Sequence, residues 1–339
     1  MSNITIDDVA KHAGVSKSTV SQFLNKRYDY MGVETKERIK LAIDELGYQP
    51  NIVARSLKLK STTTIGVIVA NILHELSTQV IRAIEDVCHE LGFHLIVCNA
   101  DDEPEKEKKY IEMLRAKQID GLIIFPTGGN IELYEQMNKE NYPIVFMDRH
   151  ISELSIDSIL LNNKRAASLA VDEFVGKGYK QIGIITTSLF KNMTPRIERI
   201  EGFKNALISH NIPIRKELIR SAAIDKIQDE VKQMLDLPTP PEAILAGNDR
   251  SFIEILKYVK KHKIKIPEEL ALIGIDDVPF AGIYNPSLTT IAQPTFEMGH
   301  KAATLLLDKI LHQNKSNEDV EFTDHIFRLE PTLISRSSC

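Results

Sequence analysis

The chain has 339 residues, 43% of them hydrophobic and 26% charged, so it is long enough for a small domain plus a larger body and is not compositionally disordered. No stretch approaches the roughly 18 apolar residues of a membrane span, and the first ten residues have no basic and apolar export signal. The sequence has three cysteines, Cys88, Cys98 and Cys339. An odd number without metal-like spacing fits a protein of a reducing compartment. We therefore expect a cytoplasmic protein without a membrane partner.

The charge is unevenly distributed along the chain. The net charge is −5, but residues 1–60 hold 10 Lys and Arg against 7 Asp and Glu, so this segment carries +3 and the remainder −8. An excess of +3 fits a nucleic-acid-binding domain, and it equally fits a solvated surface. The pattern of residues has to decide between the two.

The first fifty residues predict three short helices. Thr5 and Asp8 have the spacing of a capping box at the start of the first helix. Gly14 supplies the backbone freedom of a tight turn, and Ser16 caps a second helix. A third helix over 34–46 has apolar residues where they cover the first two. This order predicts a helix-turn-helix domain.

The second helix has a polar face opposite its apolar residues. The members of that face are Lys17, Ser18, Ser21, Gln22 and Asn25. A helix with such a face fits the major groove of DNA, where Gln bonds adenine through two hydrogen bonds and Lys reaches guanine or phosphate. A solvated polar face is the alternative interpretation. The helix-turn-helix order on both sides favours DNA contact, and we count Thr5, Ser16 and Thr19 among the expected contacts.

Several motifs in this region resemble the lactose-repressor family of bacterial regulators. They are Ile4–Ala10, Ala13–Ser16, Thr19–Ser21, Leu24–Asn25, Gly47–Asn51 and Ala54–Leu57. The family usually has Arg where this chain has Gln22, which puts the usual operator sequence in doubt but not DNA binding. The stretch 17–31 is also similar to regulators of 2-keto-3-deoxygluconate and hexuronate use.

The resemblance assigns a role to the segment that follows the head. In the family this segment is a hinge helix that enters the minor groove, and the matching residues are Asn51, Ala54 and Leu57, with Leu57 inserted between base pairs. A helix from Asn51 to Leu57 is under two turns, too short to be stable alone, so we expect it to fold on DNA beside a second subunit. A plain tether is the alternative, which Pro50 also allows.

From residue 64 onward, apolar runs of strand length alternate with amphipathic stretches of helix length, which predicts an α/β body with parallel sheets behind the all-α head. Ile182–Thr186 echoes Ile65–Val69, so we expect two similar lobes. Ligands of such sheets bind beyond the carboxyl ends of the strands, which predicts a site between the lobes. The expected boundaries are 1–49 for the head, 50–62 for the hinge and linker, 63–339 for the body, about 63–160 and 292–322 for the N-lobe, and about 161–291 and 323–339 for the C-lobe.

The body carries candidate ligand-binding residues. Asp148, Asn248 and Asp276 each directly follow a predicted strand, where a side chain faces the cleft. The resemblance extends over the body, which is similar to an effector domain related in fold to periplasmic sugar-binding proteins. Its motifs here are Phe146–Arg149, Arg199–Phe203, Gly247–Asp249, Gly274–Asp277 and Leu288–Ile291. By resemblance, those three residues and Arg199 are expected effector contacts.

Arg149 and Arg196 are further candidates for effector binding. The arginines suit an anionic effector such as a sugar acid, whereas the carboxylates suit the hydroxyls of a neutral sugar, so both remain open. The alternative for polar residues after strands is that they only cap the next helix, as Asp249 and Asp277 can do. We expect His74 to be an incidental loop histidine.

Other functions fit the sequence less well. There is no P-loop, dinucleotide fingerprint, nucleophile elbow or histidine cluster at metal spacing, so no catalytic residue, metal or cofactor is expected. Asp276 and Asp277 do not make a catalytic pair, because neighbours after a strand point apart. An exported solute-binding protein would need a signal and no head. A cytosolic sugar-binding protein without gene control remains an alternative.

A global regulator with a phosphocarrier protein as corepressor is another alternative. It would need a basic surface, but Lys106, Lys108 and Lys109 alternate with glutamates, which is typical of a solvated helix. The preferred interpretation is a homodimer on a near-palindromic operator, released when an effector between the lobes changes their angle. A tetramer-forming heptad is not visible at the C-terminus, so a dimer is the simpler expectation.

Overall fold

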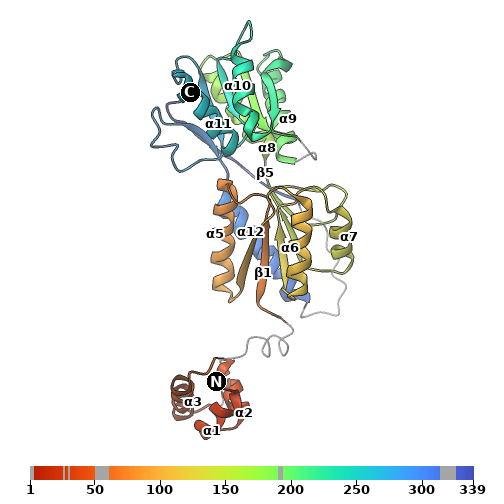
Figure 1. Cartoon of the computed structure of the whole chain (residues 1–339), viewed down its shortest axis with the longest axis vertical. Coiled ribbons are helices and arrows are strands. Elements are labelled where there is room, and N and C mark those ends of the chain that lie inside the picture. Colours follow the sequence, from red (N-terminus) through yellow and green to blue (C-terminus); the bar gives the residue numbers. More distant parts are fainter. Residues whose placement is uncertain (1–3, 26, 30, 50–60, 190–193, 314–325) are drawn as a thin grey trace. The chain divides into compact units, whose positions relative to one another are not determined.

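A computed structural model describes residues 4–25, 27–29, 31–49, 61–189, 194–313 and 326–339. The chain divides into two compact units, Met1–Thr62 and Thr63–Cys339, which are described separately below (Figure 1). The expected hinge contacts Asn51, Ala54 and Leu57 lie outside the described residues. In the part of the chain that is described, no helix is both long and apolar enough to cross a membrane.

The first unit is built from short helices with the predicted caps. These are α1 (Ile6–His12), α2 (Lys17–Leu24) and α3 (Val33–Leu46). Thr5 forms the capping box of α1, and the hydroxyl of Ser16 caps α2 by accepting the Thr19 N–H at 3.2 Å. Gly14, between the two helices, has a φ of +63°, the left-handed conformation that favours glycine. The helix-turn-helix prediction is therefore confirmed.

A small apolar core holds the three helices together. The fully or nearly fully buried residues are Val9, Ala10, Ala13, Val20, Ile39 and Ala42. They come from one face of each helix, so the opposite face of α2 is left for polar side chains. The core thus determines which residues of α2 face outward.

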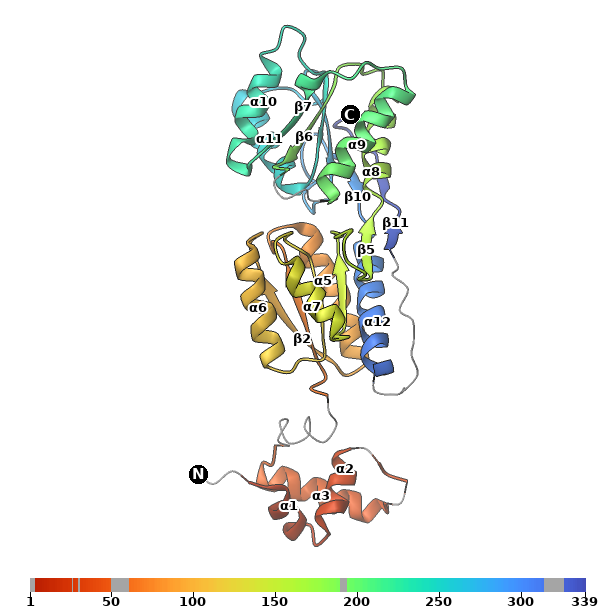
Figure 2. The same ribbon diagram turned by 90° about the vertical axis from the view of Figure 1, so that its right-hand side faces the viewer.

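The second unit consists of two lobes, each with a sheet between helices (Figure 2). Among the described residues, the N-lobe sheet has six parallel strands in the order β11-β5-β4-β3-β1-β2. The strands are β1 (Thr64–Val69), β2 (His94–Asn99), β3 (Gly121–Ile124), β4 (Ile144–Met147), β5 (Ser158–Leu161) and β11 (Ile326–Leu329). The helices are α5 (Glu75–Glu90), α6 (Pro104–Ala116), α7 (Ile131–Lys139) and α12 (Thr295–Gln313).

The C-lobe repeats this plan. Over its described residues, the sheet has six strands in the order β12-β10-β9-β8-β6-β7, and only β12 runs antiparallel to its neighbour. The strands are β6 (Ile182–Thr187), β7 (Ile219–Ala222), β8 (Ala243–Ala246), β9 (Ala271–Ile275), β10 (Thr289–Ala292) and β12 (Thr332–Ile334). The helices are α8 (Asn163–Gly176), α9 (Thr194–Ser209), α10 (Ile227–Leu235) and α11 (Asp249–His262), with short 3-10 turns at Lys216–Leu218 and Ile224–Lys226.

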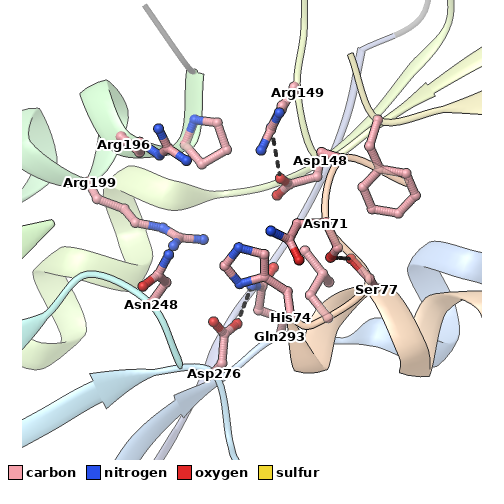
Figure 3. A pocket seen from close by; sticks show the side chains of 14 residues that line it. Asn71, His74, Ser77, Asp148, Arg149, Arg196, Arg199, Asn248, Asp276 and Gln293 are labelled. Carbon is pink, nitrogen blue, oxygen red and sulfur yellow. Dashed lines mark hydrogen bonds and ion pairs between the residues drawn. The ribbon is translucent and has the colours of Figure 1, made fainter. Parts of the chain in front are cut away.

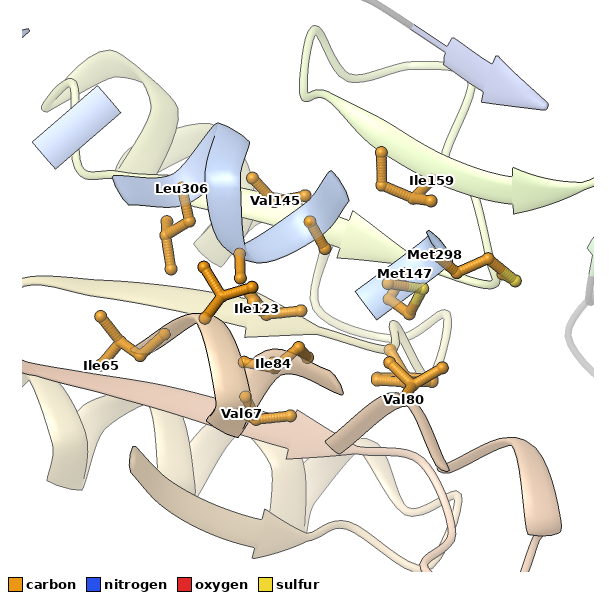
Figure 4. Packing of buried hydrophobic residues seen from close by; sticks show 14 of the residues in the cluster. Ile65, Val67, Val80, Ile84, Ile123, Val145, Met147, Ile159, Met298 and Leu306 are labelled. Carbon is orange, nitrogen blue, oxygen red and sulfur yellow. The ribbon is translucent and has the colours of Figure 1, made fainter. Parts of the chain in front are cut away.

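Alternating side chains of each strand fill two cores per lobe. In β1, Ile65 and Val67 pack under α5 and α12 (Figure 4), whereas Ile68 packs on the α6 and α7 side. Each fully buried aliphatic side chain contributes about 1.5–3 kcal/mol. Helix α12, near the end of the chain, lies beside α5, and Gly299 permits this approach because a Cβ there would come 2.7 Å from the Cβ of Ala83.

The expected lobe boundary near the C-terminus is wrong for one strand. Residues 323–339 were expected in the C-lobe, but β11 (Ile326–Leu329) pairs in parallel with β5 in the N-lobe sheet. The described chain therefore crosses between the lobes after β5, after β10 and after β11. Hydrogen bonding to the free edge of β5 decides the position of β11, and this long-range pairing leaves no local signal in the sequence.

Candidate functional site

The predicted DNA-contacting face of α2 lies on the surface of the head. Lys17, Ser18 and Gln22 are exposed, and Ser21 is half-buried. The ammonium group of Lys17 pairs with Asp7 at 2.9 Å, and because both side chains are exposed this pair adds little stability and leaves Lys17 able to exchange partners. This face therefore presents hydrogen-bonding groups that the core does not use.

Other predicted DNA contacts have structural roles in the head. Thr5 and Ser16 are the caps of α1 and α2, and the hydroxyl of Thr19 lies 2.8 Å from that of Ser16. The half-buried Asn25 ends α2, and its amide donates a hydrogen bond to the Ser21 carbonyl at 2.7 Å. These residues position the helix, and their polar groups are partly occupied without DNA.

The six predicted effector residues come together around one cavity between the two lobes (Figure 3). The cavity and its open side together contain about 520 Å³ of space. Asp148 and Arg149 follow β4, Asn248 follows β8, and Asp276 follows β9. Arg196 and Arg199 come from the first two turns of α9. Their role as effector contacts remains a prediction.

Sequence reasoning missed the rest of the cavity wall. The additional lining residues are Ala70, Asn71, His74, Leu76, Ser77, Phe125, Pro195 and Gln293. Most follow β1 or β3, where the rule that sites form beyond the carboxyl ends of strands also applies. Gln293 lies where the chain crosses between the lobes after β10, a position that only the topology reveals.

Two aspartates of the cavity have a strained backbone. Asp148 has a φ of +64° and Asp276 a φ of +86°, both in the left-handed region that disfavours residues with a side chain. Asp and Asn tolerate this region better than most residues, but the conformation still costs about 1 kcal/mol or more. The fold therefore holds both carboxyl groups in place at the ends of β4 and β9 at the expense of stability.

Two residues of the cavity wall each carry a buried acceptor that has no hydrogen-bond partner among the described residues. The acceptors are Oδ1 of Asp148 and Oε1 of Gln293. A buried acceptor without a donor costs about 1–3 kcal/mol, so such atoms are uncommon in folded proteins. The other oxygen of Asp148 lies 3.8 Å from Nε of Arg149. Both residues line the cavity, and neither acceptor is satisfied within the described protein.

The three cavity arginines differ in their partners. Arg149 donates to Asp102 at 2.8 Å and to the Pro126 carbonyl at 3.0 Å. Arg199 donates to Oδ1 of Asn163 at 2.8 Å and to a backbone carbonyl. Arg196 is half-buried and donates to the carbonyl of Ser188. Burial and the like charge of Arg149 lower the pKa of Arg196 to about 10, against the opposing effect of the Asp102 and Asp148 carboxylates.

Asp249 joins the two lobes at the edge of the cavity. Its carboxylate lies 2.6 Å from Nδ1 of His74 and accepts the Glu75 N–H at 2.8 Å, so a C-lobe residue binds the first turn of α5 in the N-lobe. Burial alone would raise the pKa of Asp249, but the hydrogen bond and charge of His74 and the Glu75 N–H outweigh it and lower that pKa. The expectation that His74 is an incidental loop residue is therefore wrong.

Asp276 is connected to this junction. One of its carboxylate oxygens accepts the Asp249 N–H at 3.0 Å, and the other accepts a hydrogen bond from the amide of Gln293. Burial, together with the charge of Asp249, raises the pKa of Asp276. The cap of α11 is Asn248 and not Asp249, because Oδ1 of Asn248 accepts the Ser251 N–H at 2.9 Å. Asn248 therefore caps a helix and also lines the cavity.

Comparison with known proteins gives matches over both units. A model of the bacterial regulatory proteins of the lacI family matches residues 5–51, and a model of the periplasmic binding protein-like domain matches residues 171–339. The probable HTH-type transcriptional regulator EndR of Paenibacillus polymyxa is 48% identical, with 98% of each chain covered. The HTH-type transcriptional regulator KdgR of Bacillus subtilis (strain 168) is 32% identical over 98% of this chain and 97% of that protein.

A solved structure with the same architecture is the lac repressor dimer bound to operator and the anti-inducer ONPF. It aligns with a TM-score of 0.84 at 25% identity, and 99% of each chain is covered. The likeness spans the head and the body.

Proposed function

Because this chain belongs to the lacI family of bacterial regulatory proteins and is a DNA-binding transcriptional regulator, we propose that it represses genes of carbohydrate or sugar-acid catabolism until a small molecule releases it. The proposal rests on the cavity, which brings two strained aspartates and two unpartnered buried acceptors to one place. Sugars and sugar acids carry the hydroxyl donors that such acceptors need. The chemistry of the cavity therefore suits a polyhydroxylated ligand.

The proposed effector contacts are Asp148, Arg149, Arg196, Arg199, Asn248 and Asp276. Their convergence from both lobes supports the idea that one ligand touches both. A ligand that binds one angle between the lobes better than another shifts the population toward that angle. To reverse a 99:1 population, it must prefer the new state by about 10⁴-fold.

At the DNA end, the proposed contacts are Thr5, Ser16, Lys17, Ser18, Thr19, Ser21, Gln22 and Asn25 of the head with Asn51, Ala54 and Leu57 of the hinge. We propose a homodimer whose two heads bind the halves of a near-palindromic operator, as the solved lac repressor binds its operator as a dimer. A protein that acts on chromosomal DNA in a bacterium works in the cytoplasm, and we propose that location.

The experiment that tests this function is an operator-binding titration. The target is the DNA that flanks the gene, and binding is followed by fluorescence anisotropy with and without 2-keto-3-deoxygluconate, galacturonate and neutral hexoses. We expect nanomolar operator binding that one class of compound weakens at least tenfold. Operator binding no tighter than binding to unrelated DNA would refute the proposal that the chain is a sequence-specific regulator. Tighter operator binding in the presence of a compound would show that the compound is a corepressor.

The alternatives have less support. Regulation by a phosphocarrier protein needs a free basic surface, but Lys106 on α6 is engaged with Asp101 and lies 6.0 Å from the Tyr110 ring. A pull-down with the phosphorylated carrier would discriminate the two. A sugar-binding protein without gene control does not account for the head. We also propose that the chain has no enzymatic activity, since it matches a family of regulators along nearly its whole length.

A further inference from the structure

Among the described residues, neither Arg196 nor Arg199 forms an ion pair with a carboxylate, but Arg199 uses two donors within the protein and Arg196 uses one. Arg149 has Asp102, and Asp249 has His74, whereas the single hydrogen bond of Arg196 among the described residues goes to a neutral carbonyl. The guanidinium group carries several N–H donors in a planar fork that matches a carboxylate. Most of that fork is unused.

Of the two cavity carboxylates, Asp148 lies nearest to Arg149, and Asp276 is engaged through both oxygens. Both oxygens of Asp276 accept hydrogen bonds, one from the Asp249 N–H and the other from Gln293 at the crossing between the lobes. Figure 3 shows Asp276 on the side of the cavity away from Arg196, while Arg149 lies on the same side as Arg196. Burial and the like charges of Arg149 and Arg199 disfavour the Arg196 cation, and the charges of Asp102 and Asp148 offset this only in part, so its pKa stays lowered.

The cavity is therefore polarised. Donors without anionic partners among the described residues lie in the first two turns of α9, near the positive end of the helix dipole. Acceptors without donors lie at Asp148 and Gln293. A neutral sugar would satisfy the acceptors but would leave Arg196 without a counter-charge. A molecule with an anionic group at one end and hydroxyls along the rest would satisfy both.

We propose that the effector is a sugar acid whose carboxylate binds Arg196 at the start of α9 and whose hydroxyls donate to Oδ1 of Asp148 and Oε1 of Gln293. This assignment rests on the proposed function, which by itself admits neutral sugars as well. A carboxylate fits better than a phosphate, because a phosphate dianion is usually held by several cationic or backbone N–H donors and Arg149 is already paired.

Calorimetry with matched pairs tests the proposal on the full-length protein. The pairs are galacturonate with galactose, glucuronate with glucose, and gluconate with glucitol, so each pair differs only in one carboxylate. We expect at least one acid to bind the wild type about 10- to 100-fold more tightly than its partner, since charge-assisted hydrogen bonds contribute about 1.5–3 kcal/mol. Arg196→Gln should remove this preference, so that the acid and its neutral partner bind with affinities within about threefold of each other.

The matched control is Arg165→Gln, which removes an exposed guanidinium of α8 in the same lobe and should leave both affinities unchanged. Galactose 6-phosphate and glucose 6-phosphate form a separate arm. If a sugar phosphate binds more tightly than every acid and Arg196→Gln abolishes that binding, the carboxylate assignment is wrong.

Two further outcomes would contradict the sugar-acid proposal without contradicting the proposed function as a DNA-binding regulator. One is a panel in which no acid binds more tightly than its neutral partner. The other is an acid preference that survives in Arg196→Gln. The regulator itself fails only in the anisotropy assay, when the protein does not distinguish operator from unrelated DNA, so the two failures are separable.

Discussion

The outer face of α2 and the cavity between the lobes both present polar side chains on a rigid scaffold. The side chains on this face of α2 are mostly exposed, whereas those of the cavity are largely buried. On α2, Lys17 and Gln22 are exposed to solvent before DNA arrives. In the cavity, Asp148 and Asp276 are more than nine-tenths buried and have a left-handed backbone. A surface site therefore costs the fold almost nothing, whereas the buried site is maintained against desolvation and strain.

This difference predicts where substitutions act. Changes on α2 alter DNA affinity without altering stability, because the exposed groups form few internal contacts. Changes around the cavity alter effector affinity by larger factors, because buried polar interactions are strong and intolerant of loss. The following experiments test that contrast, starting with the largest expected effect.

Asp148→Gly should produce the largest change. Glycine accepts the φ of +64° without strain, so the substitution removes the carboxylate and leaves the backbone as it is. We expect affinity for the tightest compound of the sugar panel to fall at least about 30-fold, since truncating a buried charged partner costs about 2–5 kcal/mol. Calorimetry measures this loss. Unchanged affinity would show that the carboxylate does not touch the ligand.

Leu57→Ala tests the hinge. By family resemblance Leu57 inserts between base pairs, a step worth about a few kcal/mol, so operator affinity should fall about 10- to 100-fold while effector affinity stays the same. Anisotropy and calorimetry measure the two quantities. An operator affinity equal to that of the wild type would show that the segment acts only as a tether.

Gly202→Ala tests the tight packing beside the cavity. A Cβ at Gly202 in α9 would come 2.4 Å from the carbonyl oxygen of Lys164 in α8, so the helices must separate. We expect the free energy of unfolding to fall by about 1–3 kcal/mol in a urea titration. Gly176→Ala is the control, because no atom lies within 4 Å of its added Cβ. Equal stability of the two variants would contradict the packing argument.

Gln22→Arg should change base preference instead of overall stability. An arginine at this exposed position can bond guanine in two places, where glutamine suits adenine, and each such pair discriminates by about 1–3 kcal/mol. A binding assay on operators with each base at every position measures the change. A preference identical to that of the wild type would show that this side chain does not reach a base edge.

Lys17→Ala should have the smallest effect. If Lys17 reaches a phosphate, its removal weakens binding uniformly across sequences and reduces the slope of log affinity against log salt by about 1. The thermal stability of the head should hardly change, since the Lys17–Asp7 pair is exposed on both sides. A loss confined to one operator base would instead identify Lys17 as a base reader.

The head was predictable because its signals are local. Caps at Thr5 and Ser16, the turn at Gly14 and the apolar spacing of α3 all act within a few residues. The alternation of buried strands and amphipathic helices also predicted both lobes. The place of β11 could not be predicted, because its pairing with β5 joins residues far apart in the sequence.

The part of the cavity wall that follows the carboxyl ends of strands could be predicted from the sequence. Asp148 and Asp276 directly follow strands, Asn248 lies two residues after one, and the structure brings all three to one cavity. His74 was misjudged because its partner, Asp249, comes from the other lobe. That Arg196 forms no ion pair with a carboxylate among the described residues is likewise visible only in the folded structure.

The left-handed backbone at positions 148 and 276 also limits how this receptor evolves. Only Asn, Asp and Gly occupy such a conformation readily, and Asn and Gly are each one base change from an Asp codon. Substitutions at these two positions are therefore limited to very few residue types. Ligand preference has far more freedom at residues such as Arg196, whose helical backbone accepts many side chains, so new specificities should arise on α9 while both aspartates persist.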